Sequence, residues 1–157
     1  MRGMRHITCL LAVAVAAAVG GCAAEDPAQG LADGVDKARA AKTLTSLQTA
    51  LVTLSLVQVD SGGAAVQDLA AALQSKDPTN RYTTAAPTTT GVVQVLGRGG
   101  EPVMLVAISD PGSEARPAQY VGVWQGSGAT MYYAGTTPPA YTSAAPAGAG
   151  WGSTLPQ

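Results

Sequence analysis

The chain has 157 residues, nine basic and ten acidic side chains, a formal net charge of −1 and 46% hydrophobic residues. This length suits one domain with a hydrophobic core plus tails. The basic residues are scattered among acidic neighbours, which excludes nucleic-acid binding, because neutralising phosphates requires a clustered basic face.

Residues 1–21 have the layout of a secretory signal peptide. A basic start with Arg2 and Arg5 precedes an apolar run over residues 7–19, and small residues follow it. The apolar run is shorter than the roughly 20 residues that a membrane-spanning helix needs. The pattern therefore predicts export followed by cleavage, in preference to a retained transmembrane anchor.

The end of this segment, Val19-Gly20-Gly21-Cys22, resembles the lipobox of bacterial lipoproteins, in which small residues precede a cysteine that is lipidated. The resemblance implies that Cys22 becomes the first residue of the mature protein and carries acyl chains. These chains would anchor the protein to the cell membrane on its extracytoplasmic face, at about 0.8 kcal/mol per buried CH₂ group. The alternative is an ordinary signal peptide cut near Ala23 or Ala24, with Cys22 discarded.

Cleavage before Cys22 would leave a mature chain without histidine, because His6 and Cys9 belong to the signal peptide. With Cys22 lipidated, the mature chain has neither a histidine nor a free thiol. This excludes a Ser-His-Asp triad, a Cys–His pair and a histidine-ligated metal. Glycosidase chemistry stays open, since it needs only two carboxyl groups held at a set separation in a cleft. We predict that the protein is no enzyme and has no cofactor and no metal site.

In the mature chain we predict a lipidated tether over residues 22–30 and a single α+β domain over residues 31–135. Apolar residues at steps of three and four predict a long amphipathic helix over residues 31–59, which ends at Asp60-Ser61-Gly62-Gly63. Three further residues widen the apolar surface of its second half, and we expect a sheet to cover them: Val52, Leu56 and Val59.

A short second helix is predicted over residues 64–74, because Asp77-Pro78 provides a stop. Residues 79–90 are expected to form a polar loop. Runs rich in β-branched and aromatic residues, separated by Gly-rich turns, then predict a meander of three or four antiparallel strands. These runs are residues 92–96, 103–108, 120–124 and 130–133.

Residues 136–157 are rich in Pro, Ala, Thr and Gly, and we predict a flexible tail because they bury too little apolar area to offset the entropy of ordering. Trp124 and Tyr132 are either core residues or part of an exposed aromatic face. Core packing is favoured, because the chain has no Phe to fill its core. Trp151 lies in the predicted tail and is the better interaction residue.

The order of a long helix, a short helix and an antiparallel meander resembles the globular domain of type IV pilins and of the pseudopilins of type II secretion. The resemblance covers residues 31–135. It includes the helix running into Ser61-Gly62-Gly63, and the strand Val121-Gly122-Val123-Trp124 that turns back into Met131-Tyr132-Tyr133. It implies a pilin-like fold with the long helix packed on the sheet. Pilins retain their hydrophobic segment, whereas here it precedes Cys22, so a lipid anchor would replace it.

Two functions are consistent with these features. The first is a membrane-anchored structural or interaction module with protein partners in the cell envelope, accessory to a type IV pilus or a type II secretion-like system. The alternative is a surface lipoprotein that binds a small ligand, a carbohydrate or a peptide through its aromatic strands.

Overall fold

The computed structural model describes residues 27–112, 117–126 and 128–154, with side chains from residue 38 onward. The chain divides into two units. The first is Met1–Val35, of which helical residues 27–35 are described, and the second is Asp36–Gln157, which contains the sheet. The predicted signal peptide, Cys22 and residues 22–26 of the predicted tether lie outside the described residues. Residues 27–30 of the predicted tether belong to the long helix, which begins at Pro27 and not at Leu31.

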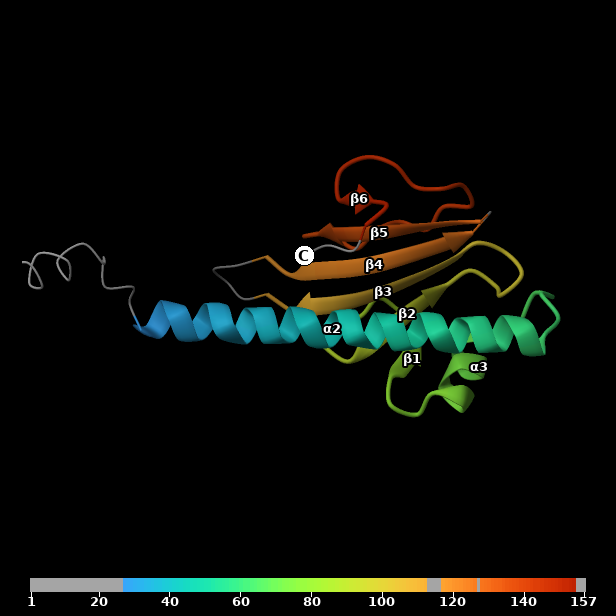
Figure 1. The fold of residues 1–157 in the computed structure, drawn as a ribbon, viewed down its shortest axis with the longest axis horizontal. Coiled ribbons are helices and arrows are strands. Elements are labelled where there is room, and N and C mark those ends of the chain that lie inside the picture. The colour runs from blue at the N-terminus through green and yellow to red at the C-terminus, as the bar shows by residue number, and fades with distance from the viewer. Residues whose placement is uncertain (1–26, 113–116, 127, 155–157) are drawn as a thin grey trace, which may run out of the picture. The chain divides into compact units, whose positions relative to one another are not determined.

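A six-stranded sheet forms the centre of the second unit, and its strands lie side by side in chain order (Figure 1). The first two strands pair in parallel and the other neighbours pair antiparallel. The elements are α2 (Pro27–Asp60), α3 (Leu69–Lys76), β1 (Arg81–Thr83), β2 (Val92–Leu96), β3 (Val103–Asp110), β4 (Gln119–Gly126), β5 (Ala129–Gly135) and β6 (Trp151–Gly152).

The α+β class, the long N-terminal helix on a mostly antiparallel sheet and the short second helix are confirmed. The predicted three- or four-stranded meander corresponds to β2–β5, and the sheet gains a strand at each edge. β1 lies within the stretch expected to be a polar loop, and β6 lies within the expected tail. Both are too short, at three and two residues, to show a hydrophobic pattern.

Helix α2 and the sheet share one hydrophobic core. The helix contributes Leu47, Ala50, Leu54 and Val57, which recur at steps of three and four and therefore lie on one face. The strands contribute alternate residues, because successive side chains of a strand point to opposite faces. These are Val93, Val95, Val103, Leu105, Ala107, Val121 and Val123. Complete burial of such a side chain stabilises the fold by roughly 1.5–3 kcal/mol.

The opposite face of the sheet has its own apolar cluster, centred on Met104, Val106 and Trp124, and the C-terminal segment packs on it. The Trp124 indole Nε1 donates to the Thr142 carbonyl at 2.9 Å, and the Tyr141 hydroxyl donates to the Pro102 carbonyl at 2.7 Å. The prediction of a flexible tail is therefore wrong for residues 136–154. Aromatic side chains of the sheet provide hydrogen-bond donors for the segment, and its prolines lower the entropy lost on ordering.

The second helix begins later than predicted, at Leu69 in place of Ala64. Its N-cap is Asp68, whose side chain accepts a hydrogen bond from the Ala71 backbone N–H at 3.0 Å. An N-cap aspartate of this kind satisfies one of the free N–H groups at a helix start. The N-cap at Asp68 therefore sets the start of the helix, although the spacing of apolar residues upstream of Asp68 is also helical.

The expectation that a sheet covers Val52, Leu56 and Val59 is also wrong. Their side chains are 64%, 54% and 77% exposed. The sheet lies against the opposite side of the helix, at Leu54, and one sheet face covers only one side of a helix.

A buried carboxylate, Asp77, joins α3, β1 and α2. It accepts hydrogen bonds from the Thr79 backbone N–H at 2.9 Å, from the Thr79 hydroxyl, from Asn80 Nδ2 at 2.8 Å and from the Tyr82 hydroxyl at 2.7 Å. Asn80 Nδ2 also donates to the Ser46 carbonyl of α2 at 3.2 Å. Burial raises the pKa of Asp77, but these hydrogen bonds outweigh it and lower the pKa to about 2 from the ordinary value of 3.8.

We predict that Asp77 makes the fold sensitive to acid. A carboxyl group whose pKa is lowered by folding stabilises the protein above its unfolded pKa, and this contribution is lost as the pH falls from about 4 towards about 2. Its size is roughly 2 kcal/mol. The Asp77→Asn variant should lose a similar amount at pH 7, because its amide N–H₂ group faces other donors. Urea unfolding at pH 7 and at pH 3 measures both effects.

The matched control is Asp68→Asn, since asparagine is an equally good N-cap and the change should alter stability little. If Asp77→Asn and the unchanged protein lose the same free energy of unfolding between pH 7 and pH 3, the carboxylate is not responsible for acid sensitivity.

Candidate functional site

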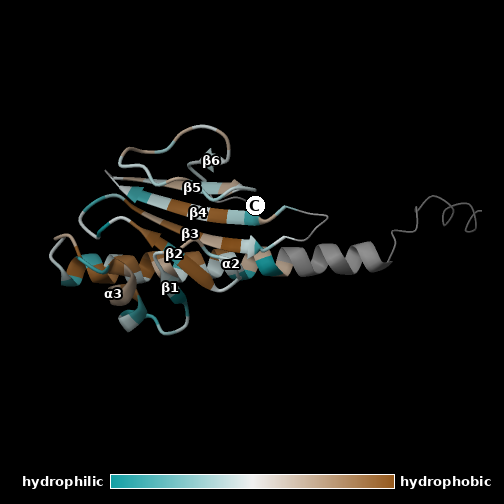
Figure 2. Ribbon diagram, turned by 180° about the vertical axis from the view of Figure 1, so that it is seen from behind, coloured by the Kyte–Doolittle hydropathy of each residue, from teal (hydrophilic) through white to brown (hydrophobic). Residues whose placement is uncertain are grey.

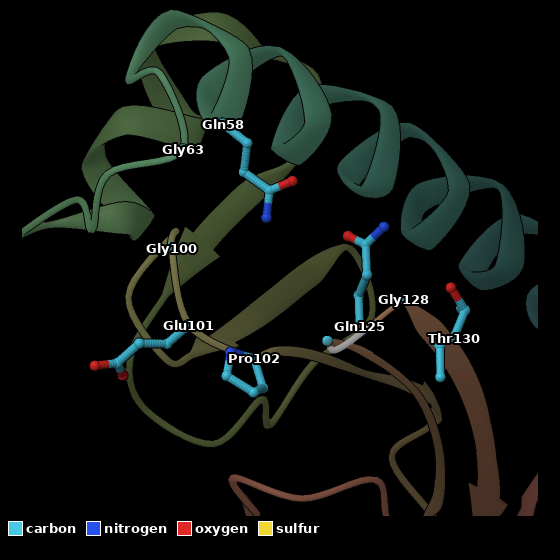
Figure 3. A pocket seen from close by; sticks show the side chains of 10 residues that line it. Gln58, Gly63, Gly100, Glu101, Pro102, Gln125, Gly128 and Thr130 are labelled. Carbon is cyan, nitrogen blue, oxygen red and sulfur yellow. The ribbon is translucent and has the colours of Figure 1, made fainter.

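A groove of about 520 Å³ opens between the C-terminal end of α2 and one end of the sheet (Figure 3). The helix end, the β2–β3 loop and the β4–β5 turn each contribute to it. We call it the amide groove, because two glutamine side chains line it. Its lining residues are Gln58, Gly63, Gly100, Glu101, Pro102, Gln125, Gly126, Gly128, Ala129 and Thr130.

Gln125 is a polar residue in an apolar position of β4. Val121 and Val123 pack on the core beneath α2, and the two-residue period of the strand places Gln125 on the same face. Its Oε1 atom is buried and has no hydrogen-bond partner among the described residues. An unpaired buried acceptor destabilises a fold by about 1–3 kcal/mol. Such a group is therefore a candidate for a role in binding.

Gln58 lies across the groove from Gln125. Figure 3 shows its amide group reaching down from α2 and the amide of Gln125 reaching up from the sheet, towards the space between them. Thr130 is paired with Gln125 in the β4–β5 register and lines the groove on the same side. Neutral hydrogen-bonding groups therefore converge here from two layers of the fold.

Glycine residues make much of the groove wall. A Cβ atom on Gly126 would lie 2.7 Å from the Cβ of Pro102, and one on Gly100 would lie 2.6 Å from the Gly63 carbonyl oxygen. Both distances are too short for a side chain without a shift of the backbone. The missing side chains therefore let these loops pack closely against one another.

The charges of the groove limit its chemistry. None of the described residues that line it is basic, so it lacks a partner for phosphate or carboxylate groups. Its one carboxylate, Glu101, points away from the two glutamines in Figure 3. A two-carboxylate mechanism needs a second acid, and none is among the described residues that line the groove. In the part of the chain that the structure describes, no cluster of His, Cys, Asp and Glu could hold a metal ion.

A second groove, of about 300 Å³, lies between α2 and the loop that follows α3. Lys42 and Asn80 are among its lining residues, but Asn80 Nδ2 already donates to Asp77 and to the Ser46 carbonyl. Its buried amide is therefore part of the structural network, and we consider the amide groove the stronger site.

The interaction residues predicted from sequence lie outside the amide groove. Trp124 is fully buried under the C-terminal segment, and Tyr132 is half-buried and packs on the core beneath α2. Trp151 is half-buried in β6, with its ring centre 5.2 Å from that of Tyr133. Cys22, the predicted lipidation site, is outside the described residues.

Gln58 and Gln125 were missed by the sequence analysis. Gln125 could have been recognised from the sequence, because it follows Val121 and Val123 at the spacing of one sheet face and interrupts an apolar series. Gln58 could not have been recognised in this way, since a glutamine near a helix end is usually solvated.

Comparisons of the chain with protein-family models, with curated proteins and with solved structures found no match. Across the described residues, no helix combines the length and the apolar character needed to cross a membrane.

We predict that Gln125→Leu raises the free energy of unfolding by about 1 kcal/mol, because it replaces an unpaired buried acceptor with an apolar group of similar size. The matched control is Gln94→Leu. Gln94 is also buried in the sheet, but its Nε2 donates to the Thr84 carbonyl at 3.1 Å. This variant should lose about 1 kcal/mol in urea unfolding. Equal losses in both variants would mean that Gln125 is satisfied in the folded protein.

Proposed function

We propose that this protein is a lipoprotein anchored by Cys22 on the extracytoplasmic face of the cell membrane, where it acts as a structural or interaction module. The observation that carries the proposal is the exposure of Val52, Leu56 and Val59 on the outward side of α2. Single exposed apolar residues are ordinary, but three on adjacent turns of one helix face form a patch typical of an interaction site.

The outward side of α2 has the spacing of a helix-packing seam. Exposed residues recur at alternating steps of three and four over six turns, and none of them is charged. We call this set, with the adjacent Leu56, the exposed seam: Ala38, Ala41, Thr45, Gln48, Val52, Ser55 and Val59. Helices pack along one another where apolar residues recur at this spacing, and Ala38, Ala41, Val52 and Val59 are the apolar members of this series. The partner is therefore proposed to be an α-helix.

The absence of charge supports this proposal. Residues 43–59 of α2 contain no Asp, Glu, Lys or Arg, although six of these residues are exposed. Figure 2 shows hydrophobic residues along β2–β4 and along the C-terminal half of α2. The outward side carries Val52, Leu56 and Val59 among uncharged polar residues, and an exposed apolar patch of this kind is typical of an interaction site. The partner helix should accordingly present small or apolar side chains without charge.

A long helix on an antiparallel sheet is also the arrangement that the resemblance to type IV pilins and pseudopilins implies. We include a role accessory to a type IV pilus or a type II secretion-like system in the proposal. In such a role the exposed seam would pack against a helix of the machinery, and the acyl chains on Cys22 would replace the hydrophobic segment that pilins retain.

The lipid anchor is tested by the intact mass of the protein extracted from membranes. We expect a mature species that starts at Cys22 and carries the added diacylglyceryl mass, and we expect Cys22→Ser to abolish this species. An unlipidated chain cut near Ala23, in the unchanged protein, would exclude the anchor while leaving the exposed seam as a binding surface.

The exposed seam is tested by Leu56→Glu. Since Leu56 is 54% exposed, folding should change by less than about 1 kcal/mol. Desolvating the new carboxylate against an apolar partner should reduce the crosslinked partner recovered from membranes at least about tenfold. The matched control, Ala71→Glu, places the same charge at an exposed position of α3 and should leave recovery unchanged. Equal recovery from Leu56→Glu would exclude the seam as the interface.

A further inference from the structure

We propose that the amide groove binds a short, uncharged segment of extended peptide through its main chain. This inference does not depend on the exposed seam or on the lipid anchor. It concerns a separate surface, formed where the apolar core beneath α2 ends and Gln125 takes the place of a core residue.

The hydrogen-bonding groups of the groove match those of a peptide backbone. A glutamine amide presents one acceptor oxygen and two N–H donors, and a peptide group presents one donor and one acceptor. The Gln125 side chain lines the groove, and its Oε1 has no partner among the described residues. Because this atom is buried, it can accept from a peptide N–H only after the side-chain amide turns towards the groove. Gln58 reaches into the space from the opposite side and can pair with a neighbouring peptide group (Figure 3).

The shape of the wall favours recognition of main chain over side chains. Gly128 lines the groove, and a Cβ atom there would meet nothing within 4 Å, so its missing side chain leaves open space for the backbone of a ligand. Pro102 and Ala129 are the apolar contacts available, and both suit small side chains. The volume of about 520 Å³ lies within the range of about 300–1,000 Å³ for ligand sites and suits a few residues.

Other ligand classes fit less well. The described lining has no basic side chain, which argues against phosphates, nucleotides and anionic peptides. A saccharide would be expected to stack on an aromatic ring, but none of the described lining residues is aromatic. Trp124 belongs to the cluster on the opposite face of the sheet, and Trp151 packs against that cluster.

The test is a titration of the full chain, labelled with ¹⁵N and held in detergent micelles. The probes are the blocked neutral peptide N-acetyl-Ala-Gly-Ala-Ala-amide and, separately, maltotriose. We expect saturable shifts of the Gln58 and Gln125 side-chain amide signals with the peptide and none with maltotriose. Gln125→Leu should weaken peptide binding at least about tenfold, which corresponds to about 1.4 kcal/mol.

Two further variants keep the outcome clear. Gln58 is half-exposed, so Gln58→Ala should weaken peptide binding without unfolding the protein. Leu56→Glu should leave peptide binding unchanged. Peptide binding of equal strength in Gln125→Leu, the absence of saturable shifts in the unchanged protein, or shifts caused by maltotriose in place of the peptide would each overturn the proposal.

Discussion

The packing of α2 on one face of the sheet is the interaction on which the rest of the structure depends. Leu47, Ala50, Leu54 and Val57 bury one side of the helix against alternate residues of the strands. Because both elements are periodic, this contact also decides what each leaves on its far side. The helix keeps Val52, Leu56 and Val59 in solvent, and the sheet presents Met104, Val106 and Trp124 on its second face.

The second face of the sheet and the outward side of α2 differ in whether another part of the chain covers them. The second face of the sheet is covered by residues that follow β5, where the hydroxyl of Tyr133 donates to the Thr137 carbonyl at 2.7 Å and β6 pairs with β5. No described segment covers the outward side of α2. This difference is why we place the proposed partner on the helix.

Two buried polar side chains show opposite relations to their surroundings. Asp77 accepts hydrogen bonds from three residues, and these bonds stabilise its ionised form. Gln125 is buried in a comparable way at Oε1 and has no such partner. A buried polar network stabilises a fold when it is satisfied, and an unsatisfied acceptor destabilises it. The first arrangement is structural, and the second is the basis of the proposed peptide site.

Periodicity in the sequence by itself determined the long helix and strands β2–β5, because these patterns repeat within each element. The tertiary structure decided what depends on residues far apart in the chain. It placed Thr142 against Trp124, Tyr141 against Pro102, and Gln58 across from Gln125. No local pattern encodes such pairs. Each follows from the packing of whole elements, which brings single polar groups within hydrogen-bonding distance or leaves them without a partner.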